Sequence, residues 1–303
     1  MDGFLIIDKP QGITSAEVIR VMKRRLRAKK IGYIGTLDPL AKGVLVVALG
    51  RGTRLIPFME KQDKEYDALL TLGAETDTQD SEGTVLNTAD PSAITEQQII
   101  DLLPKFVGDI DQTPPMFSAK KQQGQRLYTL ARQGITVERK PVRVTIRSLK
   151  LVEMTPPVAR LAATVSTGVY LRTLCHDIGA TLGVYGHLSG LVRTRSGGFR
   201  IQDSTPLEVI ENESYEQTEK RLVSLSDGLG HLPLVKVVSH AVDRLKHGIP
   251  LGVSDVIEFV GDISGDYVRI LDKDGGLIGV GTAQGGPMAG FPFTNIRPKR
   301  VLG

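Results

Sequence analysis

The longest aliphatic run in this chain, residues 44–49, is only six residues long. A run of this length suits a buried β-strand, whereas a membrane-spanning helix needs about 20 apolar residues. The first residues lack a basic segment, and their apolar run, residues 4–7, is too short for a signal peptide. We therefore expect a protein that folds around an internal sheet, without a membrane anchor.

Length and composition set the scale of the fold. The chain has 303 residues, of which 41% are hydrophobic and 24% charged, so it can bury a substantial core. We expect one large domain and a small one, or two domains of comparable size. Cys175 is the single cysteine, which excludes an intramolecular disulfide and a cysteine-cluster metal site. A cytoplasmic location follows as an expectation.

Hydrophobic patterns predict mixed α+β structure in the first part of the chain. We expect strands at residues 4–8, 44–49 and 64–76, and a loop at 32–43. A helix should follow Thr14, which has capping-box spacing to Glu17, with its buried face formed by Val18, Met22 and Leu26.

Further elements are predicted downstream. Residues 95–103 and 169–182 should be helical, and residues 142–154 and 159–167 should pair as a hairpin. Residues 113–134 look like a long excursion from the core, with a short helix within 124–134. Polar residues 211–221 should close the first domain. From about residue 232, short strands and glycine-rich turns predict a small all-β unit.

Positive charge is unevenly distributed. Residues 1–30 carry eight Lys/Arg and three acids, and residues 118–150 carry nine Lys/Arg and one acid, although the whole chain has a net charge of only +4. Such segregation favours a polyanionic partner, but two solvated basic faces would give the same pattern.

Asp38 is the strongest candidate for chemistry. Pro39 restricts it to extended backbone geometry, and the flanking Gly35 and Gly43 permit close approach of another chain segment. A carboxylate fixed in this way can act as a nucleophile or base, yet Asp-Pro between glycines is most often a simple turn. The segment does not match a phosphate-binding loop, because Lys42 precedes Gly43 instead of following a glycine.

Two other side chains have a functional and an ordinary interpretation. Tyr66, in a predicted strand, could stack on a displaced base or simply pack. Arg172 could be a surface cation, but if buried it needs an anionic partner. The five histidines lack metal-ligand spacing, and no dinucleotide fingerprint is complete. We therefore expect neither a metal nor another cofactor.

Six segments in order resemble the TruB family of pseudouridine synthases. They are residues 3–15, 35–43, 64–66, 115–120, 168–173 and 187–198, and residues 233–303 more loosely resemble a PUA barrel. The resemblance implies a pseudouridine synthase fold, namely a mixed, largely antiparallel sheet flanked by helices. It places a catalytic domain at 1–231, with a thumb-like insertion at about 113–140, and a PUA-like RNA-binding domain at 232–303.

The resemblance also implies a reaction and its residues. Uridine in the T-loop of tRNA, at the position conventionally numbered 55, would be isomerised to pseudouridine without a cofactor. Asp38 matches the catalytic aspartate, Tyr66 the base-stacking tyrosine and Arg172 the arginine paired with the aspartate, which would keep a buried carboxylate ionised. The matching substrate-binding positions are Lys9, Pro10, Tyr33, Tyr170, Leu191 and Lys120. Tyr33 departs from the histidine that is usual in the family.

Two alternatives remain. The first is a non-catalytic RNA-binding or tRNA-folding protein, for which the triplet of Asp38, Tyr66 and Arg172 would have no use. The second is a guide-RNA-dependent synthase of the dyskerin type, which relies on partners in place of the thumb-like segment. We expect a monomer that acts on the T-stem-loop without an obligate protein partner.

Overall fold

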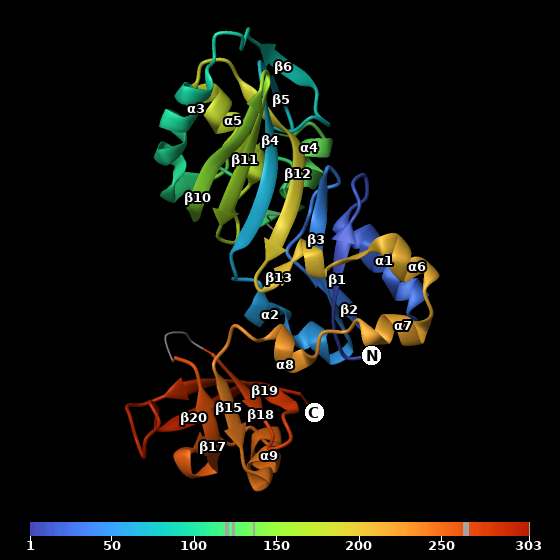
Figure 1. Ribbon diagram of the computed structural model, residues 1–303, viewed down its shortest axis with the longest axis vertical. Helices are drawn as coiled ribbons and strands as arrows, with labels where there is room; N and C mark the ends of the chain where they lie inside the picture. Colours follow the sequence, from blue (N-terminus) through green and yellow to red (C-terminus); the bar gives the residue numbers. More distant parts are fainter. Residues whose placement is uncertain (119–120, 123–124, 136, 263–266, 303) are drawn as a thin grey trace.

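The computed structural model describes residues 1–118, 121–122, 125–135, 137–262 and 267–302. Two sheets account for most of the fold, and they lie at different heights along the long axis of the molecule (Figure 1). The larger sheet has the strand order β14-β1-β3-β12-β4-β11-β10-β7, with β2 and β13 at its side. Its mixture of antiparallel and parallel pairs confirms the predicted α+β class.

The first half of this sheet is built from the N-terminal strands. β1 (Gly3–Lys9) runs antiparallel to β3 (Ala41–Leu49), so that Lys9 lies opposite Gly43 and Gly3 lies opposite Leu49. β2 (Ile31–Ile34) pairs with the edge of β3 that faces away from β1. This short strand corrects the expected loop at 32–43, which is confined to residues 35–40.

Helix α1 (Ser15–Arg25) covers this half of the sheet. Its capping box is formed by Thr14 and Glu17 as the sequence predicts. Val18, Met22 and Leu26 recur on one face and are buried in the same core as β1 and β3.

The second half of the sheet continues with longer strands. The predicted strand at 64–76 is split at Gly73, which has φ +99°, into β4 (Lys64–Leu72) and β5 (Ala74–Thr76). The expected hairpin is confirmed as β10 (Val142–Thr155) and β11 (Val158–Val165), and β7 (Gly108–Gln112) forms the edge. β5 pairs with β6 (Val85–Thr88) outside the main sheet.

Two helices complete the core of this half. α3 (Glu96–Leu102) and α5 (Leu171–Thr181) contribute Ile99, Leu174 and Ile178 to the main hydrophobic cluster. Both lie close to the ranges predicted for them. Both lie beside the upper part of the sheet, on the same side in Figure 1.

Strand β12 (Gly186–Ser196) joins the two halves. It runs parallel to β3, with Leu191 opposite Ala41, and antiparallel to β4, with Arg193 opposite Tyr66. The loop that follows β2 and the start of β4 are therefore brought to the same region of the sheet by one strand.

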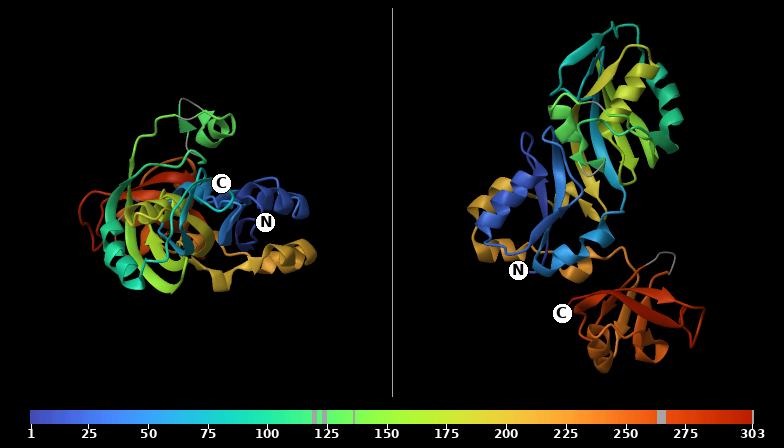
Figure 2. Two further views of the ribbon diagram at one scale, coloured as in Figure 1. Left: turned by 90° about the horizontal axis from the view of Figure 1, so that it is seen from above. Right: turned by 180° about the vertical axis from the view of Figure 1, so that it is seen from behind.

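The predicted excursion projects from the body of the molecule. The view from above in Figure 2 shows this segment standing away from the sheets. It contains the short pair β8 (Lys121–Gln122) and β9 (Gln125–Arg126), followed by α4 (Leu127–Arg132), which confirms the expected short helix.

The remaining elements before the C-terminal sheet are short. η1 (Gly50–Leu55) and α2 (Ile56–Met59) follow β3, and η2 (Leu103–Phe106) follows α3. After β12 come β13 (Phe199–Arg200), η3 (Ile201–Asp203), β14 (Thr205–Pro206), α6 (Leu207–Asn212), α7 (Tyr215–Lys220) and α8 (Leu225–Gly228).

The second sheet belongs to the C-terminal part of the chain. Its six strands have the order β16-β20-β19-β18-β15-β17. They are β15 (Leu234–Val237), β16 (Leu251–Gly252), β17 (Val256–Val260), β18 (Val268–Leu271), β19 (Leu277–Gln284) and β20 (Asn295–Val301). The all-β prediction was incomplete, because α9 (Ser239–Lys246) and η4 (Val253–Asp255) also lie here.

Apolar side chains from both parts form one cluster at their junction. Phe4 and Leu229 are buried together with Val280 and Leu302 of the C-terminal part. The ring of Phe58 also meets Tyr267 edge-on, with centroids 5.0 Å apart. This contact fixes the C-terminal sheet against the end of the larger unit. Among the described residues, no helix combines the length and apolar character needed to cross a bilayer.

Candidate active site

The loop that carries Asp38 is anchored to the start of α1. The hydroxyl of Ser15 donates to the carbonyl of Leu37 at 3.0 Å, and the amide of Leu37 donates back to the same hydroxyl at 2.8 Å. The amide of Gly12 also donates to the carbonyl of Pro39 at 2.8 Å. Asp38 is therefore held between two residues whose backbone positions are fixed.

A buried arginine supports the same loop from the neighbouring strand. Arg193 on β12 has no exposed surface, and its guanidinium donates to the carbonyls of Gly35 at 3.0 Å, Thr36 at 3.4 Å and Val44 at 2.7 Å. Gly43 is required beside it, because a Cβ there would lie 2.4 Å from the carbonyl oxygen of Arg193. The sequence identified Arg193 only as part of a family pattern, without this supporting role.

Two lysines are buried around this loop. The ammonium of Lys9 donates to the carbonyls of Pro10 at 2.9 Å and Ile13 at 2.6 Å, and that of Lys64 to Glu60 at 3.2 Å and Gln62 at 2.9 Å. Burial lowers the pKa of each lysine to about 8, and for Lys9 the nearby Asp38 carboxylate opposes this effect. Both side chains brace backbone turns.

Asp38 forms an ion pair with Arg172. Nε of Arg172, in the first turn of α5, lies 3.0 Å from Oδ2 of Asp38. The arginine side chain is only 6% exposed, whereas that of Asp38 is 43% exposed. The expectation of a buried carboxylate was therefore wrong, because Arg172 is buried but Asp38 is partly exposed to solvent.

Arg172 is held independently of Asp38. Its Nη1 lies 3.5 Å from Oδ2 of the buried Asp80 and donates to the carbonyl of Thr78 at 3.1 Å. Its Nη2 donates to the carbonyl of Phe117 at 2.6 Å, at the base of the excursion. Asp80 is a site residue that the sequence did not reveal, since it lies in an acidic turn without a distinctive pattern.

A cavity of about 230 Å³ opens beside Asp38 and Arg172. Tyr66 and Leu191 line it from adjacent strands, and Tyr170 lines it from the residue before α5. The backbone of Tyr170 is fixed by Gln112, whose side chain accepts from its amide at 2.8 Å. Burial raises the pKa of the Tyr170 hydroxyl. An aromatic ring, an aliphatic side chain and an ion pair thus surround one small space.

A second cavity, of about 360 Å³, lies on another side of the same ion pair. Tyr33 of β2 lines it together with Asp38, Arg172 and Glu82. Burial raises the pKa of the Glu82 carboxyl, and the negative charges of Asp80 and Asp38 raise it further. Asp38 therefore stands between two hollows.

The remaining predicted substrate-binding residues lie elsewhere. Lys9 is fully buried beneath the loop and Pro10 is exposed in the turn before α1, and neither lines either cavity. Lys120 lies outside the residues that the structure describes. Across the described ranges, His, Cys, Asp and Glu side chains do not gather in groups of three or more that could hold a metal ion.

The chain was compared with protein families. The model of the TruB family pseudouridylate synthase N-terminal domain matches residues 23–171, and that of the tRNA pseudouridylate synthase B C-terminal domain matches residues 172–234. The junction of the two matches falls at Arg172. Together they cover both partners of the ion pair.

Individual relatives give the same result. The tRNA pseudouridine synthase B of Syntrophotalea carbinolica is 43% identical, with 91% of this chain and 90% of the relative covered. That of Geobacter sulfurreducens is 40% identical, with 100% and 99% covered. The structure of a Cbf5-Nop10-Gar1 complex is also similar, with a TM-score of 0.77 and 28% identity over 99% of this chain and 84% of the matched chain. This chain belongs to the TruB family of pseudouridylate synthases.

Proposed function

We propose that this protein is a tRNA pseudouridine synthase that isomerises uridine 55 in the T-loop, with Asp38, Tyr66 and Arg172 as its catalytic residues. The observation that carries the proposal is the 3.0 Å ion pair between Asp38 and the buried Arg172 at the mouth of a cavity lined by Tyr66. Family membership and the names of the relatives support the reaction type.

The reaction needs an ionised carboxylate beside the ribose. The C1′–N1 bond breaks, the free base turns, and a C1′–C5 bond forms while C5 loses its proton and N1 gains one. Asp38 acts either by attacking a carbon of the sugar or by removing a sugar proton to give a glycal. The fixed guanidinium of Arg172 holds the Asp38 carboxylate in place for either route.

The base must leave the T-loop to reach Asp38. Flipping it out costs a few kcal/mol, which contacts in the pocket must offset. The ring of Tyr66 offers a stacking surface, Leu191 an apolar wall and Tyr170 a further aromatic side chain. Tyr33, in the adjacent hollow, lies where it would meet the RNA that the departing base leaves behind.

A carboxylate that is 43% exposed requires a cover during the reaction. The bound RNA would exclude water from Asp38, so that the ion pair is strengthened only when substrate is present. The base of the excursion lies next to this opening, because the carbonyl of Phe117 accepts a hydrogen bond from Arg172. We assign the excursion at 113–140 as the thumb-like segment that closes over the stem-loop.

Basic side chains supply the affinity for RNA. Residues 1–30, which include α1, and residues 118–150 carry the excess of positive charge. Contacts from such residues go mainly to phosphates, which gives affinity and orientation without reading sequence. Specificity would then come from the shape of the T-loop.

We also propose the division of the chain into domains. Residues 1–231 would form the catalytic domain and residues 232–303 a PUA-like RNA-binding domain that acts as part of a monomer in the cytoplasm. The second candidate is a guide-RNA-dependent synthase, which the similarity to Cbf5 raises. The higher identity to the tRNA pseudouridine synthase B relatives favours independent action.

The decisive experiment uses purified protein and an unmodified tRNA transcript that carries tritium at C5 of uridine. We expect tritium release by the protein alone, without a guide RNA or partner protein, and none by Asp38→Asn, which should still bind tRNA in a filter assay. Asp101→Asn, on the exposed face of α3, is the matched control and should release tritium normally. Normal turnover by Asp38→Asn would refute the assignment, and turnover only with an added guide would support the second candidate.

A further inference from the structure

A second cavity system lies at the opposite end of the N-terminal strands from Asp38. This far pocket has a volume of about 410 Å³ and is lined by the start of β1, the α1–β2 connection, η1 and Tyr215 of α7. In β1 the turn beside Asp38 follows Lys9, whereas the far pocket lies next to Gly3. At about 3.3 Å per residue, this strand separates the two sites by roughly 20 Å.

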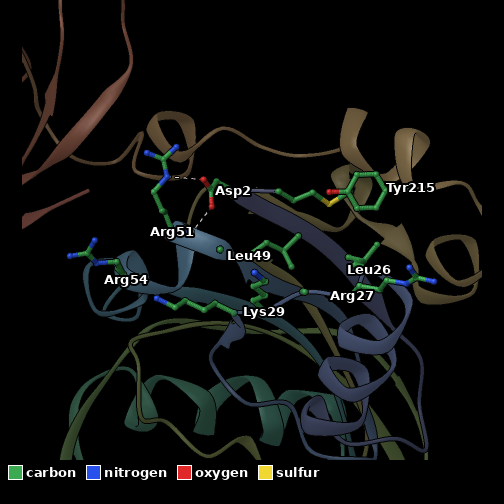
Figure 3. Close-up of a pocket in the computed structure, with 12 residues that line it drawn as sticks. Asp2, Leu26, Arg27, Lys29, Leu49, Arg51, Arg54 and Tyr215 are labelled. Carbon is green, nitrogen blue, oxygen red and sulfur yellow. Dashed lines mark hydrogen bonds and ion pairs between the residues drawn. The ribbon is translucent and has the colours of Figure 1, made fainter. Parts of the chain in front are cut away.

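The lining of the far pocket is strongly basic. It contains five cationic side chains and one acidic one, Asp2; the cations are Arg27, Lys29, Lys30, Arg51 and Arg54. Figure 3 shows Arg51 and Arg54 on one side of the hollow, with Arg27 and Tyr215 on the other. Positive side chains therefore lie on both sides of the space.

Only one of these cations is neutralised within the described part of the chain. Nε of Arg51 lies 2.7 Å from Oδ2 of Asp2, and its amide also donates to this carboxylate at 2.8 Å. Arg27, Lys29, Lys30 and Arg54 form no ion pair with a described residue. Arg27 also has φ +47°, an unusual conformation for an arginine, immediately after the helix.

A basic ridge connects the far pocket to the active site. Ser15, the first residue of α1, lines the cavity beside Asp38, and the residues just after the helix line the far pocket. Arg20 and Arg24 of α1 are exposed and four residues apart, so they lie along one face of the helix, and Arg27 is exposed just beyond its end. An extended polyanion could follow this face from one site to the other.

We propose that the far pocket binds backbone phosphates of the tRNA outside the T-loop while uridine lies at Asp38. This inference rests on the proposed function and extends it to a second contact. The charge of the pocket and its continuity with α1 favour RNA over a small anion, since an isolated anion would leave the ridge without a partner. The far pocket would thus favour intact tRNA over a short hairpin.

The test compares two RNAs and two matched variants. Lys29→Gln/Lys30→Gln removes two charges from the far pocket, and Lys61→Gln/Lys105→Gln removes two exposed lysine charges, one in the turn after α2 and one in η2. Dissociation constants are measured over a range of salt for intact tRNA and for a short T-arm hairpin. Thermal melting checks that both variants fold like the wild type.

We expect Lys29→Gln/Lys30→Gln to weaken binding of intact tRNA by roughly tenfold and to lower the salt slope by about 2. Binding of the hairpin should stay unchanged, as should kcat with saturating tRNA, and the control variant should bind both RNAs like the wild type. Equal losses for tRNA and hairpin, or equal losses for the two variants, would overturn the far pocket as a specific contact. If the wild type converts neither RNA, the proposed function itself fails.

Discussion

Ser15 and Leu37 exchange two hydrogen bonds, so that a helix N-terminus and the active-site loop share one anchor. Ser15 is 1% exposed, and its hydroxyl is both donor and acceptor for the backbone of the residue before Asp38. The position of the carboxylate therefore depends on a side chain that takes no part in the reaction.

Ser15→Ala should lower kcat and leave the dissociation constant for tRNA unchanged. Loss of the hydroxyl leaves the amide and carbonyl of Leu37 unpaired, at a cost of about 1–3 kcal/mol in the free energy of unfolding. Ser189→Ala removes a hydroxyl that bonds Thr71 and Leu69 elsewhere on the sheet and serves as control. Equal kcat values for the two variants would contradict the anchoring role.

Asp80→Asn should reduce kcat by roughly a hundredfold, because Arg172 loses the buried charge that helps to orient it toward Asp38. Single-turnover rates at saturating tRNA measure this effect. The matched control is Asp255→Asn, which disturbs another buried carboxylate paired with an arginine, Arg244, far from the site. Asp255→Asn should lose stability without losing turnover.

Arg193→Lys should destabilise the protein by roughly 2–4 kcal/mol, since an ammonium cannot reproduce the fork that reaches three carbonyls. Activity of the folded fraction should also fall as the Asp38 loop loosens. Urea denaturation provides the measurement. Arg195→Lys, on the same strand but paired with Glu65 nearer the surface, should cost less than about 1 kcal/mol; a similar cost for both would disprove the support role.

The buried lysines predict a pH-dependent stability. The pKa of Lys64 is about 8 in the folded protein, below its ordinary value of 10.5, so between these values the unfolded chain binds more protons. The penalty of burying the charge is complete below pH 8 and disappears as the pH rises toward 10.5. The free energy of unfolding of the wild type, relative to Lys64→Met, should therefore increase over this window. A constant difference between pH 7 and 10 would show that burial does not shift Lys64.

Local patterns predicted much of the fold because their causes are local. The capping box of Thr14 and Glu17 and the spacing of Val18 and Met22 specify α1 without reference to the rest of the chain. β2 escaped prediction because four residues around Gly32 carry too little periodicity, and only pairing with β3 makes them a strand. α9 was missed because its short polar sequence resembles the turns around it.

The candidate site was predictable in part for a related reason. Asp38, Tyr66 and Arg172 stand in recognisable segments, and the structure brings them to one cavity. Arg193 acts through hydrogen bonds to backbone carbonyls, and Asp80 acts through the guanidinium of Arg172, which is distant in sequence. No spacing in the sequence encodes either contact. The exposure of Asp38 was misjudged because its cover is expected to be the RNA, which lies outside the chain.

The place of β12 in the sheet has a mechanical consequence. On one side this strand is bonded to β3, which follows the Asp38 loop, and on the other to β4, which carries Tyr66. The distance between the Asp38 carboxylate and the Tyr66 ring is thus set by the hydrogen bonds that β12 makes to its two neighbours. Any increase in this distance would require β12 to bend or to shift against its neighbours. We therefore expect the nucleotide to enter through movement of peripheral segments, while the sheet around β12 stays unchanged.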